Sequence, residues 1–211
     1  MKNILCFGDS LTWGAIPNGG RHEYETRWPN VLQTGLGAEA RVIVEGLNGR
    51  TTIFDDFSTA ADLNGARILP TLLATHQPLD CVIIMLGCND MKPSISGCAV
   101  SSARGMLRLV QIIKGFPYVD DADVPKILLV APPVCVETDH EELGVVFAGA
   151  VEQSAKLAAK YIRVANEEKT AFFDAASVAN ASPIDGVHLD EKNTKAIGMA
   201  LREKIKSLLQ I

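Results

Sequence analysis

The stretch "ILCFGDSLTWG", Ile4–Gly14, decides the fold of this chain. An apolar, strand-like run ends at Gly8 and passes directly into an acid and a hydroxyl, Asp9 and Ser10, before apolar residues return. Glycine permits a tight turn from a strand into a helix, so the Ser10 hydroxyl can project from the end of the strand. The stretch therefore predicts a strand, a turn and a helix, with a polar group at the turn.

Short apolar runs of this kind recur along the chain, bounded by Gly, Pro or Asn. The five predicted strands are Asn3–Phe7, Ala40–Glu45, Asp80–Leu86, Lys126–Ala131 and Thr170–Asp174. They are nearly continuous in apolar character rather than alternating, which is typical of strands covered on both faces of a parallel sheet.

Segments with the apolar spacing of helices lie between these strands. The clearest are Trp28–Leu36, Ala103–Phe116, Phe147–Val164 and Thr194–Leu209. Alternating strands and helices predict an α/β fold, a three-layer α/β/α sandwich around a five-stranded parallel sheet with right-handed crossovers. No repeat or linker composition divides the chain, so residues 1–211 are expected to form a single domain.

Composition and charge exclude several function classes. The formal net charge is -5 and the basic residues are scattered, which argues against nucleic acid as a partner. The sequence contains neither a secretory leader nor a long apolar membrane span, so we expect a cytoplasmic protein with no membrane partner. The five cysteines lack metal-ligand spacing and are predicted to be reduced thiols, with Cys6 and Cys81 buried in strands and Cys88 inert.

The carboxyl ends of parallel strands meet at one edge of a sheet, where ligands bind in open α/β folds. Four loops predicted at this edge carry selected polar residues: "GDSLTWG" (Gly8–Gly14), "GLNGRTT" (Gly46–Thr52), "GCND" (Gly87–Asp90) and "DGVH" (Asp185–His188). Two further loops are unusually long and are candidate walls of a pocket, Gly14–Thr26 and Pro132–Gly144.

These loops supply the parts of a nucleophilic site. A serine hydroxyl needs a base, the base needs an acid to hold its tautomer, and the developing oxyanion needs fixed donors. Ser10 is the candidate nucleophile, His188 the base, and Asp185 the acid three residues before it. The backbone N–H groups of Ser10 and Gly49 and the side-chain amide of Asn89 are the candidate oxyanion donors.

The four loops, in this order, resemble the motifs of the SGNH (GDSL-type) hydrolases along the whole chain. The resemblance implies a flavodoxin-like fold and assigns the same roles to Ser10, Asp185, His188, Gly49 and Asn89. It implies neither a cofactor nor a metal ion. The second motif departs from the family pattern, because Glu45 stands where asparagine is usual.

The stretches "EGLNGRTT", "LNGARILP" and "PLDCVIIMLGCND" resemble most closely the bacterial arylesterase and acyltransferase branch. That branch implies hydrolysis of short-chain aryl or alkyl esters through an acyl-serine, with acyl transfer to alcohols or hydrogen peroxide. It also implies a homo-oligomer, which the long loops Gly14–Arg27 and Val134–Phe147 could support by packing across a subunit interface. The expected partner is a small-molecule ester.

Two other functions stay open on the sequence alone. Asp9 and Asp90 with His188 could serve a metal-dependent phosphoester hydrolase, although hydrogen bonds from these acids to backbone amides are the simpler interpretation. The loops could instead form a flavodoxin-like binding module without catalysis.

Several side chains have a structural interpretation beside a functional one. Trp13 either walls the substrate pocket or packs in the core. Asp190 is expected to cap the last helix. The remaining histidines, His22, His76 and His140, are expected to be ordinary solvated residues.

Overall fold

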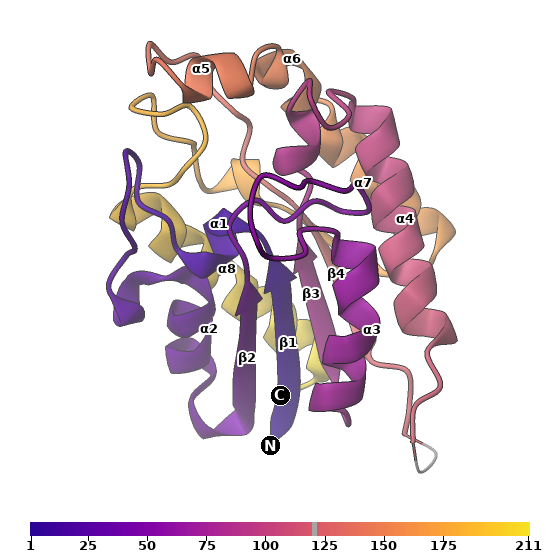
Figure 1. Ribbon diagram of the computed structural model, residues 1–211. Helices are drawn as coiled ribbons and strands as arrows, with labels where there is room; N and C mark the ends of the chain where they lie inside the picture. Colours follow the sequence, from indigo (N-terminus) through magenta and orange to yellow (C-terminus); the bar gives the residue numbers. More distant parts are fainter. Residues whose placement is uncertain (120–121) are drawn as a thin grey trace.

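The computed structural model of the protein describes residues 1–119 and 122–211. A five-stranded parallel sheet forms its centre, in the order β2-β1-β3-β4-β5 (Figure 1). Its strands are β1 Lys2–Gly8, β2 Ala40–Gly46, β3 Cys81–Met85, β4 Lys126–Ala131 and β5 Ala171–Asp174. The predicted α/β fold with a five-stranded parallel sheet is confirmed. The strand order changes direction beside β1, so a crevice at its carboxyl end is the expected ligand site.

Helices cover both faces of the sheet (Figure 1). They are α1 Ser10–Trp13, α2 Trp28–Leu36, α3 Gly65–His76, α4 Ala99–Gly115, α5 Leu143–Val146, α6 Ala150–Ser154, α7 Leu157–Glu167 and α8 Glu191–Leu209. Short 3-10 turns are η1 Tyr24–Thr26, η2 Gly37–Glu39, η3 Asn89–Met91 and η4 Ala175–Ser177. Helices α2 and α8 pack together on one face, while α3, α4 and α7 cover the other.

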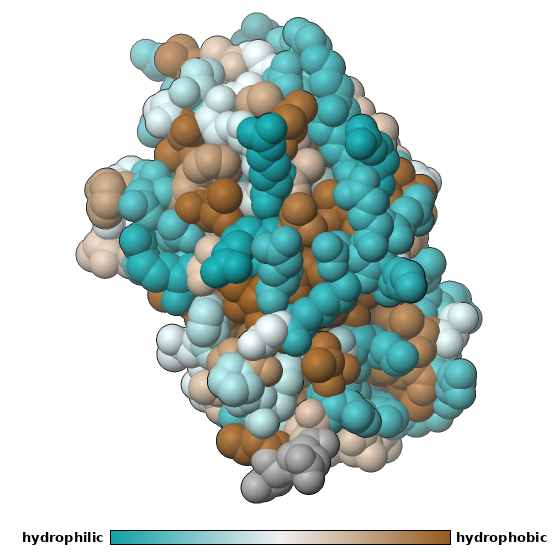
Figure 2. All heavy atoms as spheres, turned by 90° about the vertical axis from the view of Figure 1, so that its right-hand side faces the viewer, coloured by the Kyte–Doolittle hydropathy of each residue, from teal (hydrophilic) through white to brown (hydrophobic). Residues whose placement is uncertain are grey.

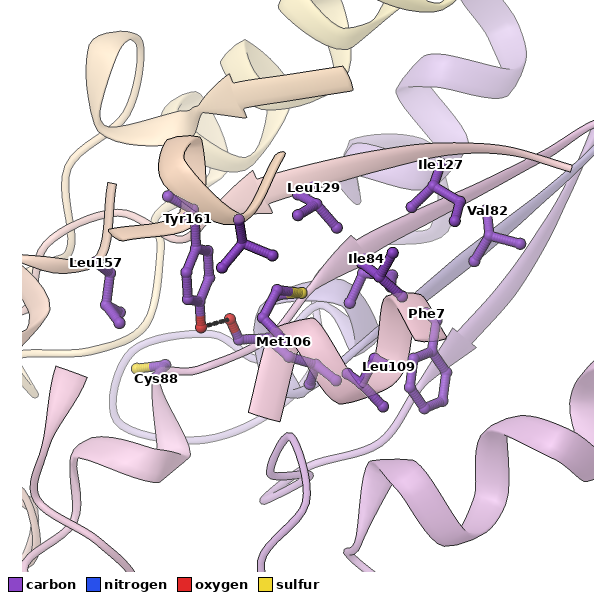
Figure 3. Close-up of a cluster of buried hydrophobic side chains, with 14 of the residues drawn as sticks. Phe7, Val82, Ile84, Cys88, Met106, Leu109, Ile127, Leu129, Leu157 and Tyr161 are labelled. Carbon is purple, nitrogen blue, oxygen red and sulfur yellow. Dashed lines mark hydrogen bonds between the residues drawn. The ribbon is translucent and has the colours of Figure 1, made fainter. Parts of the chain in front are cut away.

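Two apolar clusters, one on each face of the sheet, form the core. Successive residues of β1 alternate between them, with Leu5 and Phe7 in one cluster and Ile4 and Cys6 in the other. Figure 3 shows the first cluster, in which sheet residues such as Ile84 and Leu129 face Met106 and Leu109 of α4. Burial on both faces explains why the strands are continuous apolar runs. Cys6 and Cys81 are buried in these strands, as predicted.

The structure corrects two features of the predicted helices. The segment Phe147–Val164 was expected to be one helix, but α6 and α7 are separate. The hydroxyl of Ser154 at the break bonds the carbonyl of Val151 at 3.3 Å and accepts from the N–H of Cys135 at 3.0 Å. Helix α3 was not predicted, because Pro70 within it obscures the helical pattern.

Figure 2 shows the side of the molecule that carries α4. Hydrophilic side chains dominate this face, and hydrophobic atoms are visible between them. Within the described residues, no helix combines the length and the apolar character needed to cross a membrane.

Candidate active site

The turn after β1 holds Ser10 at the carboxyl edge of the sheet. Asp9 caps α1, because its Oδ1 accepts a hydrogen bond from the N–H of Leu11 at 3.0 Å. Gly8 is required by close approach, since a Cβ atom there would lie 2.0 Å from Oγ1 of Thr12. This local geometry leaves Ser10 as the first residue of α1, with its side chain at the end of β1.

Ser10, His188 and Asp185 form a continuous hydrogen-bonded chain. Nε2 of His188 lies 3.1 Å from Oγ of Ser10, and Nδ1 of His188 lies 2.7 Å from Oδ2 of Asp185. Gly186 makes the intervening tight turn with a φ of +80°, and a Cβ there would lie 2.7 Å from the carbonyl of Val136. The structure thus brings the three predicted triad side chains together.

The environment of Asp185 keeps it ionised. Its Oδ1 accepts from the N–H groups of Val187 at 3.1 Å and His188 at 2.9 Å, and its Oδ2 also accepts from the N–H of Asn18 at 3.2 Å. Burial alone would raise the pKa of Asp185, but the hydrogen bonds from the ring and backbone of His188 and from Val187 outweigh it and lower the pKa to about 2. A carboxylate beside Nδ1 favours the tautomer in which Nε2 faces Ser10 as an acceptor.

Residues that follow His188 in the chain are fixed by hydrogen bonds, and they support its position. Asp190 caps α8 as predicted, with its Oδ1 accepting from the N–H of Asn193 at 2.8 Å. His22 lies 6% exposed, and its Nε2 is 2.8 Å from the carbonyl oxygen of Leu189. The expectation that His22 is solvated is therefore wrong, because the loop Gly14–Thr26 folds back onto the segment that carries His188.

The three predicted oxyanion donors face the same space as Ser10. Gly49 has a φ of +84°, a left-handed conformation that favours glycine. The side-chain Nδ2 of Asn89 donates to the carbonyl of Arg50 at 3.2 Å and lies 3.5 Å from Oδ2 of Asp9, and these two contacts fix the amide at the cavity. Within the described residues, the N–H groups of Ser10 and Gly49 donate no backbone hydrogen bond. Their roles as oxyanion donors stay a prediction.

Arg50 was not predicted from the sequence to have a role at the site, but its hydrogen bonds stabilise the loop of the second motif. Its Nη1 donates to the carbonyl of Gly8 at 2.8 Å and to that of Glu45, and its guanidinium lies 4.4 Å from the ring centre of Phe7. Burial lowers the pKa of Arg50 to about 10, so the side chain stays charged at neutral pH. The loop is thus held through the backbone of Glu45, whose own side chain lies 2.9 Å from Nε2 of His76.

Asp9 and Asp90 both face protein donors. Asp90 accepts from the backbone N–H of Thr52 at 2.9 Å and from its hydroxyl at 2.6 Å, which joins the second and third motifs. Burial raises the pKa of Asp9 to about 6. Across residues 1–119 and 122–211, no three His, Cys, Asp or Glu side chains converge as a metal-binding group. The metal-dependent alternative therefore gains no support.

Comparison with protein families shows to which class of protein the chain belongs. The model of the GDSL-like Lipase/Acylhydrolase family matches residues 6–193. The chain belongs to this family. Membership confirms the predicted resemblance and the predicted class of carboxylic ester hydrolase.

Solved structures similar to this acylhydrolase agree over the whole chain. A carbohydrate acetylesterase family member from Sinorhizobium meliloti is 50% identical with a TM-score of 0.98, covering 100% of both chains. A protein from Agrobacterium tumefaciens str. C58, provisionally assigned as an arylesterase, is 51% identical with a TM-score of 0.93, covering 98% of this chain and 99% of that one. The native M. smegmatis aryl esterase is 42% identical with a TM-score of 0.93, covering 99% and 100%. A search of curated proteins gave no significant match.

The acylhydrolase has a cavity of about 650 Å³ at this edge, and Ser10, His188, Gly49 and Asn89 line it. Trp13 also lines the cavity, with the guanidinium carbon of Arg21 4.3 Å from its ring centre. Both long loops contribute to the walls, as expected. Their lining residues are Ala15, Ile16, Asn18, Gly19, Gly20, His140, Glu142 and Leu143.

A polar part of this wall was not predicted from the sequence. Lys92 and Asp56 face the cavity as an ion pair, with Nζ 3.5 Å from Oδ2, and Nζ also lies 5.7 Å from the ring centre of Phe147. Lys92 is three residues beyond Asn89, which is the one signal in the sequence that could have indicated it. His140 likewise lines the cavity, and its Nδ1 accepts from the N–H of Leu143 at 3.2 Å, so it is not merely a solvated residue.

Proposed function

We propose that the protein hydrolyses short-chain acyl esters through an acyl-serine intermediate on Ser10. The observation that carries this proposal is the hydrogen-bonded chain from Ser10 through His188 to Asp185, at the wall of a cavity of about 650 Å³. A binding module without catalysis has no need for this arrangement of nucleophile, base and acid. The geometry therefore favours acyl transfer over simple ligand binding.

In the first step Oγ of Ser10 attacks the ester carbonyl while Nε2 of His188 takes its proton. The ionised Asp185 stabilises the imidazolium that forms, and the negative carbonyl oxygen is held by the N–H groups of Ser10 and Gly49 and by Asn89. His188 then gives its proton to the leaving alcohol or phenol. Water attacks the acyl-serine in the second half of the cycle, with His188 again acting as the base.

The substrate class follows from the cavity and from the similar proteins. The cavity combines apolar side chains such as Trp13 and Phe147 with polar ones such as Asn48 and Lys92, which suits a small acyl group on an aryl or polyol leaving group. Similar structures are an aryl esterase and a carbohydrate acetylesterase family member, and acetate is therefore the first acyl group to test. We also infer that an alcohol or hydrogen peroxide can replace water as the acyl acceptor.

The experiment compares hydrolysis of p-nitrophenyl acetate by wild type and Ser10→Ala, each with and without EDTA. Loss of a nucleophile costs ~10⁴ to 10⁶ in turnover, so the variant should be essentially silent, while EDTA should leave wild type unchanged. Ser207→Ala, at an exposed position of α8, is the matched control and should match wild type. Activity that survives in Ser10→Ala, or that follows the metal, would overturn the proposal.

Three broader expectations belong to the same proposal. Residues 1–211 act as one domain, supported by neighbours that match the chain from end to end. The protein works as a homo-oligomer, and a strict monomer in light scattering at micromolar concentration would contradict this. Five free cysteines support a reducing, cytoplasmic location.

A further inference from the structure

Two buried cysteines are in contact next to the active site. Sγ of Cys88 lies 3.8 Å from Sγ of Cys135, and each residue is 3% exposed. Cys88 follows β3 and Cys135 follows β4, so the contact joins two neighbouring loops at the catalytic edge of the sheet. Figure 3 shows Cys88 at the end of the core cluster where Leu157 and Tyr161 lie.

Both cysteines are connected to catalytic parts through the backbone. Cys88 directly precedes Asn89 in the third motif. Cys135 directly precedes Val136, whose N–H donates to the carbonyl of Gly186 at 2.9 Å, next to Asp185. A change in the distance between the two sulfurs would therefore act on the oxyanion side and on the acid side of the site together.

The two sulfurs are in van der Waals contact, which places them within reach of a disulfide. The S–S bond is ~2.05 Å long, so the two sulfurs must approach by about 1.7 Å, which side-chain rotation and small loop shifts can supply. Cys6 and Cys81, the other buried cysteines, are neighbours on β1 and β3, but within the described residues no hydrogen bond joins their sulfurs as one joins those of Cys88 and Cys135. Cys98 is the N-cap residue of α4. Among the five thiols, the pair Cys88 and Cys135 is the one already placed for a bond.

The two thiols are also chemically unequal. The hydrogen bond from Cys88 and the bond to Ser154 lower the pKa of the Cys135 thiol despite its burial. The same hydrogen bond to Cys135, together with burial, raises the pKa of Cys88. Because the thiolate is the reactive form, Cys135 is the attacking sulfur and Cys88 the resolving one. This role for Cys88 replaces the inert thiol expected from the sequence.

A small oxidant has room beside Cys135. This residue lines a cavity of about 60 Å³, whose wall includes Leu143, Phe147 and Asp185. The same three residues line the large active-site cavity, so the two spaces share a wall. On the same measure a cavity needs ~10 to 15 Å³ to hold one water molecule, so the smaller cavity can admit a molecule of the size of hydrogen peroxide.

We propose that Cys88 and Cys135 form an oxidation site that hydroperoxides convert into a disulfide, and that this disulfide lowers the esterase activity. The Cys135 thiolate attacks one peroxide oxygen, the O–O bond breaks, and the leaving hydroxide takes a proton to become water. Sulfur of Cys88 then attacks the sulfenic acid of Cys135, the S–O bond breaks, and hydroxide leaves with the Cys88 proton as a second water. Two thiols lose two electrons and one hydrogen peroxide gains them.

The effect on activity follows from the place of Cys88. Pulling its sulfur toward Cys135 shifts the third motif and moves the Asn89 amide away from its hydrogen bond to Arg50. Complete loss of an oxyanion donor costs ~10² to 10³ in turnover, so a displaced donor should cost at least about tenfold. Reduction by dithiothreitol should restore the activity, because no heavy atom has been added or removed.

The test uses the full chain carrying Cys98→Ser, which removes the cysteine outside the buried set. The protein is treated with hydrogen peroxide in the absence of ester, the peroxide is removed, and intact mass, peptide mapping and p-nitrophenyl acetate hydrolysis are measured. We expect loss of two hydrogens, a Cys88–Cys135 linked peptide and at least about a tenfold fall in turnover that dithiothreitol reverses. Cys135→Ala in the same background should keep its own activity through the treatment, and Cys6→Ala should still form the disulfide.

Two results would overturn the proposal. One is peroxide treatment that leaves both thiols free or oxidises them without linking them. The other is a linked peptide with unchanged turnover. The predicted fall in turnover rests on the proposed esterase function, whereas the predicted disulfide, which is detected by mass, does not. An untreated chain without esterase activity therefore refutes that function and leaves disulfide formation to be decided by mass.

Discussion

Nε2 of His188 lies 3.1 Å from Oγ of Ser10, although the two residues are 178 positions apart in the chain. The contact forms because the end of β1 and the loop before α8 meet at the same edge of the parallel sheet. It joins the first motif to the last, so it requires every strand between them to be in place. The candidate nucleophile and base therefore depend on the complete fold rather than on one local segment.

Removing the base should abolish turnover without unfolding the chain. We expect His188→Ala to lower kcat by ~10⁴ to 10⁶, and Asp185→Asn by ~10⁴, because the amide no longer fixes the required tautomer. The measurement is steady-state hydrolysis of p-nitrophenyl acetate, with the circular dichroism spectrum as a check of folding. His76→Gln is the matched control, and an equal loss in that variant would show that the effect is not specific to the triad.

Asn89 should contribute to the transition state more than to substrate binding. Asn89→Ala removes one amide donor and is expected to lower kcat by ~10² to 10³, with a much smaller change in KM. Asn180→Ala, at an exposed position, is the control for loss of an amide. A rise in KM with unchanged kcat would instead make Asn89 a ground-state binding residue.

The ion pair of Lys92 with Asp56 should tune the response of the cavity to substrate charge. Lys92→Met leaves the Asp56 carboxylate uncompensated and should raise KM for an ester with an anionic acyl chain relative to a neutral ester. Asp56→Asn should have the opposite effect. A unit charge roughly 10 Å away at an effective dielectric of about 20 changes the energy by ~1.7 kcal/mol, so each shift should be on the order of tenfold. If the ratio of KM for the anionic ester to KM for the neutral ester were the same in wild type and both variants, this role would be ruled out.

Asp9 should make stability depend on pH. Its pKa is about 6 in the folded chain, against ~3.9 for a free carboxyl, so the folded state binds more protons between these values. Protonated Asp9 therefore contributes to the free energy of unfolding. This contribution is complete below about pH 4 and is lost as the pH rises through about 6, a change of ~3 kcal/mol.

Asp9→Asn cannot ionise, so it should gain stability relative to wild type between those pH values. Urea unfolding of both proteins at several pH values measures this difference. Asp123→Asn, at an exposed position, should show no such trend. If the difference in free energy of unfolding between Asp9→Asn and wild type stayed constant with pH, it would contradict the account.

The strands and the site residues could be predicted because their signals are local. Buried parallel strands are short apolar runs, and the motifs of Ser10, Gly49 and Asn89 each follow one of them directly. The motif of His188 comes later, after β5 and the turn η4, and reaches the same edge of the sheet. Asp190 could be predicted as a cap for the same reason, since its partner Asn193 is three residues away.

The missed features depend on contacts between distant segments. His22 is buried by Leu189, which is 167 positions away, and no local pattern marks that contact. Asp56 meets Lys92 only because the segment after the second motif folds back over the cavity. Helix α3 was hidden by Pro70, whose missing N–H and fixed φ argue locally against a helix that packing nevertheless stabilises.

The most direct test of the central claim is to trap the acyl-enzyme and locate it. Wild type is mixed with p-nitrophenyl acetate, quenched in acid within milliseconds to seconds, and analysed by intact mass and peptide mapping. The account predicts one acetyl group on the peptide that contains Ser10, more of it in Asp185→Asn if deacylation slows, and none in Ser10→Ala. Substrate turnover in wild type with no acetyl group on Ser10, or an acetyl group on another residue in its place, would contradict the account.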